Sequence, residues 1–367
     1  MKEVRIIFMV SLLAALSSCI KEELLNAEAD ILTCTVQGTV LKRQPRIGND
    51  KIVLMVKSNA DLKHIAPLFT LTRGATIAPE SGTPLDFSSP QYYTVTSEDR
   101  QWKKVYEVSC DTSALQKKYD FENYELDAKQ HYYLFYELTE SGSKQYLWSC
   151  GNELFDLIAS GSDPDNYPTT VSDAGKSGYC LMLQTKSTGV FGSWSDKPIA
   201  TGSLFMGAFE SDSALIYPLK ATRFGTPIDF LPNELTGYYK YKAGTVYTDK
   251  KGKTVPGAKD NFDIYAVLFE TDEGLNTLDG ANVLSSPSII AIARIDESDR
   301  VESDAWRMFK IPFVYKPGRA IDLQKLDDDK YSLTVVFSSS IAGDLFMGSV
   351  GSTLFIDEVV LSEKTDL

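Results

Sequence analysis

Hydrophobic and polar positions alternate along short runs of this chain, which is the pattern of β-strands. In residues 331–338, YSLTVVFS, apolar side chains occupy every second position from Tyr331 to Phe337. Ser332 and Thr334 fall on the opposite face. Other short runs rich in β-branched and aromatic residues, separated by clusters of Gly, Pro, Asn, Asp or Ser, are DILTCTVQG, KIVLMVKS, KKVYEVSC, HYYLFYEL, FDIYAVLFE and STLFIDEVVL. Such strands bury one face against a second sheet, so the pattern predicts an all-β protein built from β-sandwiches.

The spacing of these runs predicts two domains. A chain of 367 residues favours two domains over one. We expect a first β-sandwich over residues 28–112 and a second over residues 116–364, joined by a short link around residues 111–118.

The N-terminus carries a targeting segment. The apolar run 6–16 follows Lys2 and Arg5 and is shorter than the ~20 residues that a membrane-spanning helix needs, which is typical of a signal peptide. Residues 16–19, LSSC, resemble the bacterial lipobox, in which the leader is cleaved before a cysteine that is then acylated. This predicts a signal peptide over 1–18, a lipidated Cys19 and a tether over 19–27; an ordinary secretory leader is the alternative.

The residues after this cysteine indicate the destination. IKEE at 20–23 resembles the acidic signal that directs lipoproteins of Bacteroides-type bacteria to the outer face of the outer membrane. The sequence therefore predicts an outer-membrane lipoprotein that faces outward and contacts the membrane through its lipid anchor.

Composition limits the partners of the protein. With 43% hydrophobic and 24% charged residues the chain is globular. The net charge is −13, and removal of residues 1–18, where Lys2 and Arg5 outweigh Glu3 by one charge, leaves −14. Nucleic acid is a poor partner for such a surface. The two histidines, His64 and His131, are far apart and each fits a structural role, which argues against a histidine zinc site or a Ser-His triad.

Four cysteines follow the lipobox: Cys34, Cys110, Cys150 and Cys180. An exported protein can oxidise them, and four thiols allow three pairings, among which the sequence does not choose. Pairing within each domain, Cys34 with Cys110 and Cys150 with Cys180, is our expectation, and buried free thiols are the alternative.

Two stretches resemble known families. The first domain, notably ATIAPESGTPLDFSSPQYYTVT followed by KKVYEV, resembles the immunoglobulin-like domains near the N-terminus of many surface lipoproteins of these bacteria. The second domain resembles the putative carbohydrate metabolism domain family through five motifs in the expected order: YDFENYEL (119–126), GSLFMGAFE (202–210), LTGYYKYKAG (235–244), AWRMFKIPFVY (305–315) and SSSIAGDLFMGSVGSTLFIDEVVL (338–361). This resemblance implies a jelly roll related to carbohydrate-binding modules, and the family has no established catalytic residues.

Carboxylates in two of these motifs are candidates for a metal. The first and last strands of a jelly roll tend to meet, which would bring Glu122 near Asp357 or Glu358. Carbohydrate-binding jelly rolls often hold a structural calcium at that place, and carboxylate oxygens suit it. The alternative is that these side chains are exposed or cap backbone donors.

Aromatic residues are the candidates for a sugar site, because pyranose rings pack on aromatic faces. Trp194, in the Gly- and Ser-rich segment GVFGSWSDKP, is predicted to lie exposed on a loop; a plug at the end of the sandwich is the alternative. In LTGYYKYKAG, alternation puts Tyr239 and Tyr241 on one strand face and Tyr238 on the other, and one of these faces must be core. Two further candidates flank strand-like runs, where the core is the favoured placement: Trp148 and Trp306.

Three functions fit these observations. The first is a noncatalytic, surface-anchored protein that binds glycans, and the second is a structural or adhesion protein that binds neighbouring surface proteins. The third is a glycoside hydrolase or lyase with paired carboxylates. Glu210, Asp357 and Glu358 stand near the motifs, but their spacing assigns them no catalytic role.

Overall fold

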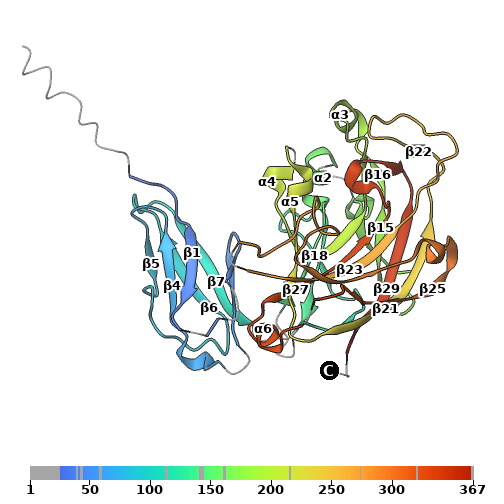
Figure 1. Cartoon of the computed structure of the whole chain (residues 1–367). Coiled ribbons are helices and arrows are strands. Elements are labelled where there is room, and N and C mark those ends of the chain that lie inside the picture. The colour runs from blue at the N-terminus through green and yellow to red at the C-terminus, as the bar shows by residue number, and fades with distance from the viewer. Residues whose placement is uncertain are drawn as a thin grey trace, which may run out of the picture. The chain divides into compact units, whose positions relative to one another are not determined.

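The computed structural model describes residues 25–364 except 39, 42–43, 58–59, 112–114, 140–143, 160–162, 215, 273 and 320. Cys19 and the predicted leader and acidic signal lie outside the described residues. The chain separates into two compact units, residues 1–112 and 113–367, and this division falls within the expected link. Both units consist mainly of strands (Figure 1).

The first unit is a sandwich of two sheets. One sheet pairs β1 (Ile31–Val36) with β4 (Pro67–Leu71). The other has five strands in the order β2 (Arg46–Ile47), β3 (Lys51–Met55), β7 (Lys103–Asp111), β6 (Gln91–Thr96) and β5 (Thr76–Ala78), and a short 3-10 helix, η1 (Leu62–His64), precedes β4. β3 and β7 run parallel. Side chains of both sheets, including Cys34 of β1 and Tyr93 of β6, share one core, which confirms the immunoglobulin-like sandwich.

The second unit packs a large sheet against a smaller one. The larger sheet has the order β13 (Trp148–Ser149), β18 (Ser203–Phe209), β27 (Tyr331–Ser338), β23 (Asp263–Glu270), β24 (Ile289–Arg294) and β26 (Val314–Tyr315), with β19 (Thr222–Phe224) on β18 and β20 (Thr226–Pro227) on β27. The smaller sheet has the order β14 (Thr169–Ser172), β15 (Cys180–Gln184), β29 (Thr353–Glu363), β21 (Pro232–Lys242) and β25 (Ser303–Pro312), with β8 (Lys118–Tyr119) on β29. The predicted all-β jelly-roll sandwich is confirmed, and its first and last strands pair at Tyr119 and Val359.

The larger sheet is buried on both faces. One face shares the main core with the smaller sheet, and the other carries a second apolar cluster that includes Phe205 and Phe269. Ser332 and Thr334 are therefore fully buried, although they occupy the polar face of the pattern in β27. The hydroxyl of Thr334 donates to the carbonyl of Met206 at 2.9 Å, which satisfies it in this setting.

Short elements complete the second unit. The helices are α2 (Asn152–Ala159), α3 (Gly189–Trp194), α4 (Ser211–Ala214), α5 (Pro218–Ala221), α6 (Leu323–Asp327), η2 (Pro164–Asn166), η3 (Glu297–Asp299) and η4 (Gly343–Leu345). The short strands are β9 (Tyr124–Leu126), β10 (Tyr133–Phe135), β11 (Glu137–Leu138), β12 (Lys144–Gln145), β16 (Lys186–Ser187), β17 (Ile199–Ala200), β22 (Tyr247–Thr248) and β28 (Gly348–Ser349). No helix among the described residues has the length and apolar character to span a membrane.

The expected disulfides are not formed. Cys34, Cys110, Cys150 and Cys180 are all free thiols, Cys34 and Cys180 being buried. Burial raises the pKa of each thiol, so these side chains behave as small apolar groups of the cores.

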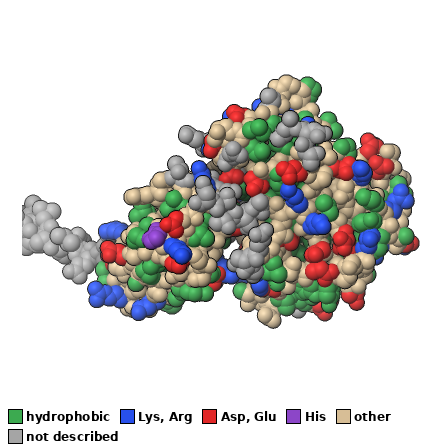
Figure 2. Space-filling view, turned by 90° about the horizontal axis from the view of Figure 1, so that it is seen from below, with side chains coloured by type: hydrophobic (Ala, Val, Ile, Leu, Met, Phe, Trp, Pro, Cys, Tyr) green, Lys and Arg blue, Asp and Glu red, His purple; other side chains and the backbone are tan. Residues whose placement is uncertain are grey.

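Charged side chains are mixed on the surface. On the face shown in Figure 2, Lys and Arg side chains lie among Asp and Glu side chains, and apolar side chains are scattered between them. The net negative charge is therefore not gathered on one part of that face.

Candidate functional site

Trp194 lies at the end of a short helix and is 85% exposed. The sequence predicts a loop here, but residues 189–194 form α3. After this helix the chain turns back tightly toward Thr188. The hydroxyl of Thr188 donates to the carbonyl of Lys197 at 2.5 Å. A Cβ on Gly192 would lie 2.0 Å from that hydroxyl, so a larger residue does not fit without a shift. The closed turn presents the indole to solvent. This agrees with the expected exposure of Trp194 and does not fit a plug at the end of the sandwich.

Two other segments meet the turn that carries Trp194. The Nζ of Lys197 lies 5.9 Å from the ring centre of Phe346 in the turn that follows η4. A Cβ on Gly252 would lie 3.4 Å from the side chain of Pro198. Further exposed apolar side chains in or beside these three segments are Val190, Val246, Leu345 and Val350. Trp194 therefore belongs to an end of the sandwich where several loops expose apolar groups, a feature of binding surfaces.

Tyr239 and Tyr241 are core residues, so their prediction as ligand contacts is wrong. Their exposed fractions are 2% and 1%, and both rings pack 4.7 Å from the ring of Phe262. The hydroxyl of Tyr239 donates to the carbonyl of Asp299 at 2.8 Å. The larger sheet covers this face of β21, which is why the pair is buried.

The opposite face of β21 carries Tyr238 and Lys240 toward solvent. The Nζ of Lys240 lies 4.5 Å from the ring centre of Trp306 on β25 and 4.7 Å from that of Phe355 on β29. Trp306 is half-buried on this outer face instead of in the core. The outer face thus carries two of the predicted aromatic residues, Tyr238 and Trp306. The ammonium of Lys240 lies within cation–π distance of Trp306 and Phe355.

Sequence reasoning missed Phe355. The signal that could have found it is the alternation in β29, where Leu354 and Ile356 are fully buried and Phe355 is not. Directly opposite Phe355 lie Lys240 of β21 and Met182 of β15, so Phe355 and Met182 add apolar side chains to the outer face that carries Lys240.

Trp148 lies in the core, the placement favoured for it. Its ring makes an edge contact with Tyr119 at 5.2 Å, and its Nε1 donates to Glu137 at 2.9 Å. Burial raises the pKa of Glu137 to about 7, while the hydrogen bond from Trp148 lowers it. Trp148 is also among the residues that line a cavity.

Two of the candidate calcium ligands, Asp357 and Glu122, hold a loop. The carboxylate of Asp357 accepts hydrogen bonds from the backbone N–H of Lys176 at 2.7 Å and of Ser177 at 3.3 Å. Glu122 accepts from the backbone N–H of Tyr179 at 2.9 Å. The capping alternative therefore describes both side chains. Glu358 is half-buried with φ 51°, and its own N–H donates to Asp357.

Metal ligands are not clustered in the described part of the chain: no group of three or more His, Cys, Asp or Glu side chains there could hold an ion. His131 is instead paired with Asp156 at 3.0 Å, and His64 with Asp61 at 2.7 Å. Both histidines have the structural pairing that the sequence favours.

Comparison with known proteins identifies the family. Residues 120–362 match the model described as putative carbohydrate metabolism domain, and residues 31–110 match the model described as SGBP, N-terminal, where SGBP denotes surface glycan-binding protein. No curated protein matches the chain.

Two solved structures are similar over long stretches. One, titled a putative glycoside hydrolase from Bacteroides thetaiotaomicron, is 47% identical, with a TM-score of 0.84, over 94% of this chain and 100% of its own. The other, titled a putative glycoside hydrolase from Bacteroides vulgatus, is 38% identical, with a TM-score of 0.65, over 69% of this chain and 100% of its own. The chain belongs to the putative carbohydrate metabolism domain family.

Proposed function

We propose that this protein is a noncatalytic lipoprotein of the outer membrane that binds glycans at the cell surface. The exposed Trp194 is the observation that carries the proposal. Exposing a large apolar ring to water is unfavourable, and the position on α3 gives the ring no share in the core. Binding to a sugar ring would remove this surface from water.

The surroundings of Trp194 suit a sugar. Pyranose rings stack their C–H faces on aromatic rings, and their hydroxyls need hydrogen-bond partners nearby. Asp196 is exposed two residues further along the turn, in the left-handed conformation at φ 56°. Its carboxylate supplies acceptors beside the indole.

The rest of the chain supports the same role. The first unit matches a model named for surface glycan-binding proteins. Acylation of Cys19 and the tether 19–27 would keep the second unit close to the cell, where a captured glycan is useful.

Trp194→Ala tests the proposal. We expect the variant to lose at least about tenfold in affinity for the polysaccharide that the natural protein binds, because stacked aromatic contacts are anchors of binding. Affinity gel electrophoresis against a panel of neutral and acidic polysaccharides finds the ligand, and calorimetry measures the dissociation constant. Trp102→Ala is the matched control, since Trp102 is 63% exposed on the first unit.

Other outcomes point elsewhere. Unchanged affinity of Trp194→Ala together with a loss in Trp306→Ala would move the site to the outer face of the smaller sheet. If no polysaccharide is retained and the protein instead captures neighbouring surface proteins, the adhesion function replaces glycan binding.

Hydrolysis is a second candidate because both solved relatives are titled putative glycoside hydrolases. Most such enzymes need two carboxyl groups about 5 to 9.5 Å apart across the scissile bond. Release of reducing sugar from the bound polysaccharide, abolished by a single Asp or Glu substitution, would establish catalysis and overturn the noncatalytic proposal.

A further inference from the structure

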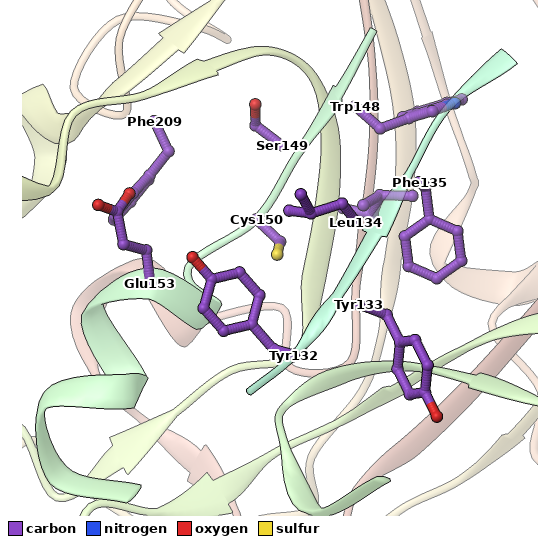
Figure 3. A pocket seen from close by; sticks show the side chains of 10 residues that line it. Tyr132, Tyr133, Leu134, Phe135, Trp148, Ser149, Cys150, Glu153 and Phe209 are labelled. Atoms are coloured by element: carbon purple, nitrogen blue, oxygen red, sulfur yellow. The ribbon is translucent and has the colours of Figure 1, made fainter. Parts of the chain in front are cut away.

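A half-open cavity of about 120 Å³ lies beside the N-terminal end of α2 in the second unit. Its walls come from β10, β13, α2 and β18, and Figure 3 shows the side chains. The lining residues are Tyr132, Tyr133, Leu134, Phe135, Trp148, Ser149, Cys150, Glu153, Leu204 and Phe209. Of the aromatic residues predicted above as sugar contacts, Trp148 is the one among these lining residues.

One wall is apolar and firmly held. The indole of Trp148 is fixed by its hydrogen bond to Glu137 and by the rings of Tyr119 and Phe121, at 5.2 Å and 5.6 Å. A wall whose rotamer is locked in this way needs no reordering when a ligand enters. Phe209 adds a half-buried ring from β18.

The polar groups of the cavity are oriented by partners outside the ligand space. The hydroxyl of Ser211 donates to one carboxylate oxygen of Glu153 at 2.8 Å. The hydroxyl of Ser149 donates to the carbonyl of Gly207 at 2.9 Å. Tyr132 and Glu153 turn toward the same space in Figure 3, so an acceptor and a phenolic hydroxyl face a ligand together.

The electrostatics of the cavity disfavour an anionic ligand. Among the ten described lining residues Glu153 is the one acid, and none is Lys, Arg or His. Burial raises the pKa of Tyr132, and the nearby charges of Glu153 and Asp127 raise it further. The cavity is therefore negative, which disfavours a carboxylate or sulfate group and favours hydroxyl donors.

The size limits the ligand to one ring. A volume of about 120 Å³ is well above what one water needs and below the ~300 to 1,000 Å³ of sites for drug-sized ligands. A polysaccharide cannot thread through it. We infer that the cavity is a subsite for a single neutral hexose at a chain end or branch of the glycan, with Glu153 accepting hydroxyl hydrogen bonds and Phe209 packing on the ring. This inference rests on the proposed glycan binding.

Saturation-transfer NMR on the full chain tests it, with D-galactose, D-glucose and D-mannose as neutral probes and D-galacturonic acid as the anionic probe. We expect transfer to at least one neutral hexose and none to galacturonic acid. Glu153→Gln should weaken hexose binding about fivefold to tenfold, because a charge-assisted hydrogen bond becomes a neutral one. Phe209→Ala should weaken it as well, and Glu297→Gln, on the exposed η3, is the control.

Charge reversal separates a ligand contact from a structural role. Glu153→Lys should admit galacturonic acid, which a structural role of Glu153 would not produce. Transfer to galacturonic acid in the natural protein, no transfer to any of the three hexoses, or hexose binding unchanged in both Glu153→Gln and Phe209→Ala would overturn the inference. If polysaccharide binding through Trp194 persists in any of these cases, only the cavity inference fails. If the protein binds no glycan at all, both the cavity inference and the proposed glycan binding fail.

Discussion

Glu137 is a carboxylic acid with very little water around it. It is 5% exposed, and burial raises its pKa from 4.5 to about 7. Because the folded-state pKa lies above the unfolded value, the contribution of Glu137 to stability is fully present below about pH 4.5 and is lost as the pH rises through about 7. The second unit should therefore lose stability across this window.

Glu137→Gln removes this loss, since the amide keeps an oxygen acceptor for the indole of Trp148 and cannot ionise. We expect the variant to be more stable than the natural protein at pH 8, by up to roughly 3 kcal/mol, and similar to it near pH 4.5. Urea unfolding at both pH values measures the difference. A variant that is equally stable or less stable at pH 8 would show that Glu137 ionises without cost.

Tyr239 and Trp194 are both large aromatic residues, yet their truncation should have opposite consequences. Tyr239→Ala leaves a cavity in the core and should lower the free energy of unfolding by about 3 to 5 kcal/mol. Trp194→Ala changes only exposed surface and should stay within about 0.5 kcal/mol. Denaturant unfolding of the second unit compares the two. A large loss in Trp194→Ala would contradict its placement on the surface.

At the scale of elements, the loop between β14 and β15 is held on the smaller sheet by carboxylates from two distant motifs. Asp357 lies on β29 and Glu122 follows β8, and both accept from the backbone of residues 176–179. The two carboxylates thus hold a loop that borders the outer face of the smaller sheet. In this loop the Nζ of Lys176 lies 4.2 Å from the ring centre of Tyr238.

Asp357→Ala should release this loop. Loss of the acceptor removes two hydrogen bonds from exposed loop residues, at a net cost of about 0.5 to 1.5 kcal/mol. Hydrogen exchange of residues 173–179 should become faster while the core strands remain protected. Glu358→Gln is the matched control at the neighbouring position. Unchanged exchange in Asp357→Ala would mean that other contacts hold the loop.

The calcium expectation has its own measurement at this place. Because backbone donors already occupy oxygens of both carboxylates, a chelator such as EDTA should leave the melting temperature of the second unit unchanged. A fall of several degrees, restored by calcium, would show that an ion binds here after all.

At the scale of the whole molecule, the proposed lipid anchor would decide where the two units work. Cys19→Ala should move the protein from the membrane fraction to the soluble fraction, because the acyl chains would have no attachment point. Protease added to whole cells should digest the natural protein. Retention of Cys19→Ala in the membrane would contradict the anchor, while resistance to protease would contradict only the outward orientation.

Local sequence was enough to predict the strands, the two sandwiches and the motifs of the second domain. Alternation and turn residues act within a few positions, so they predict strands wherever the rest of the chain lies. The same local logic predicts the leader and its Cys19, which stay predictions. The pairing of β8 with β29 followed from the resemblance to a known fold.

Only the tertiary structure decided which faces are buried. In LTGYYKYKAG the alternation is certain, but the side on which the larger sheet packs makes Tyr239 a core residue and Tyr238 an outer one. Trp148 and Trp306 flank similar runs, yet one is in the core and the other on the outer face. The cavity joins residues from 132 to 209. Contacts between distant segments depend on sheet order and loop paths, which no short window of sequence contains.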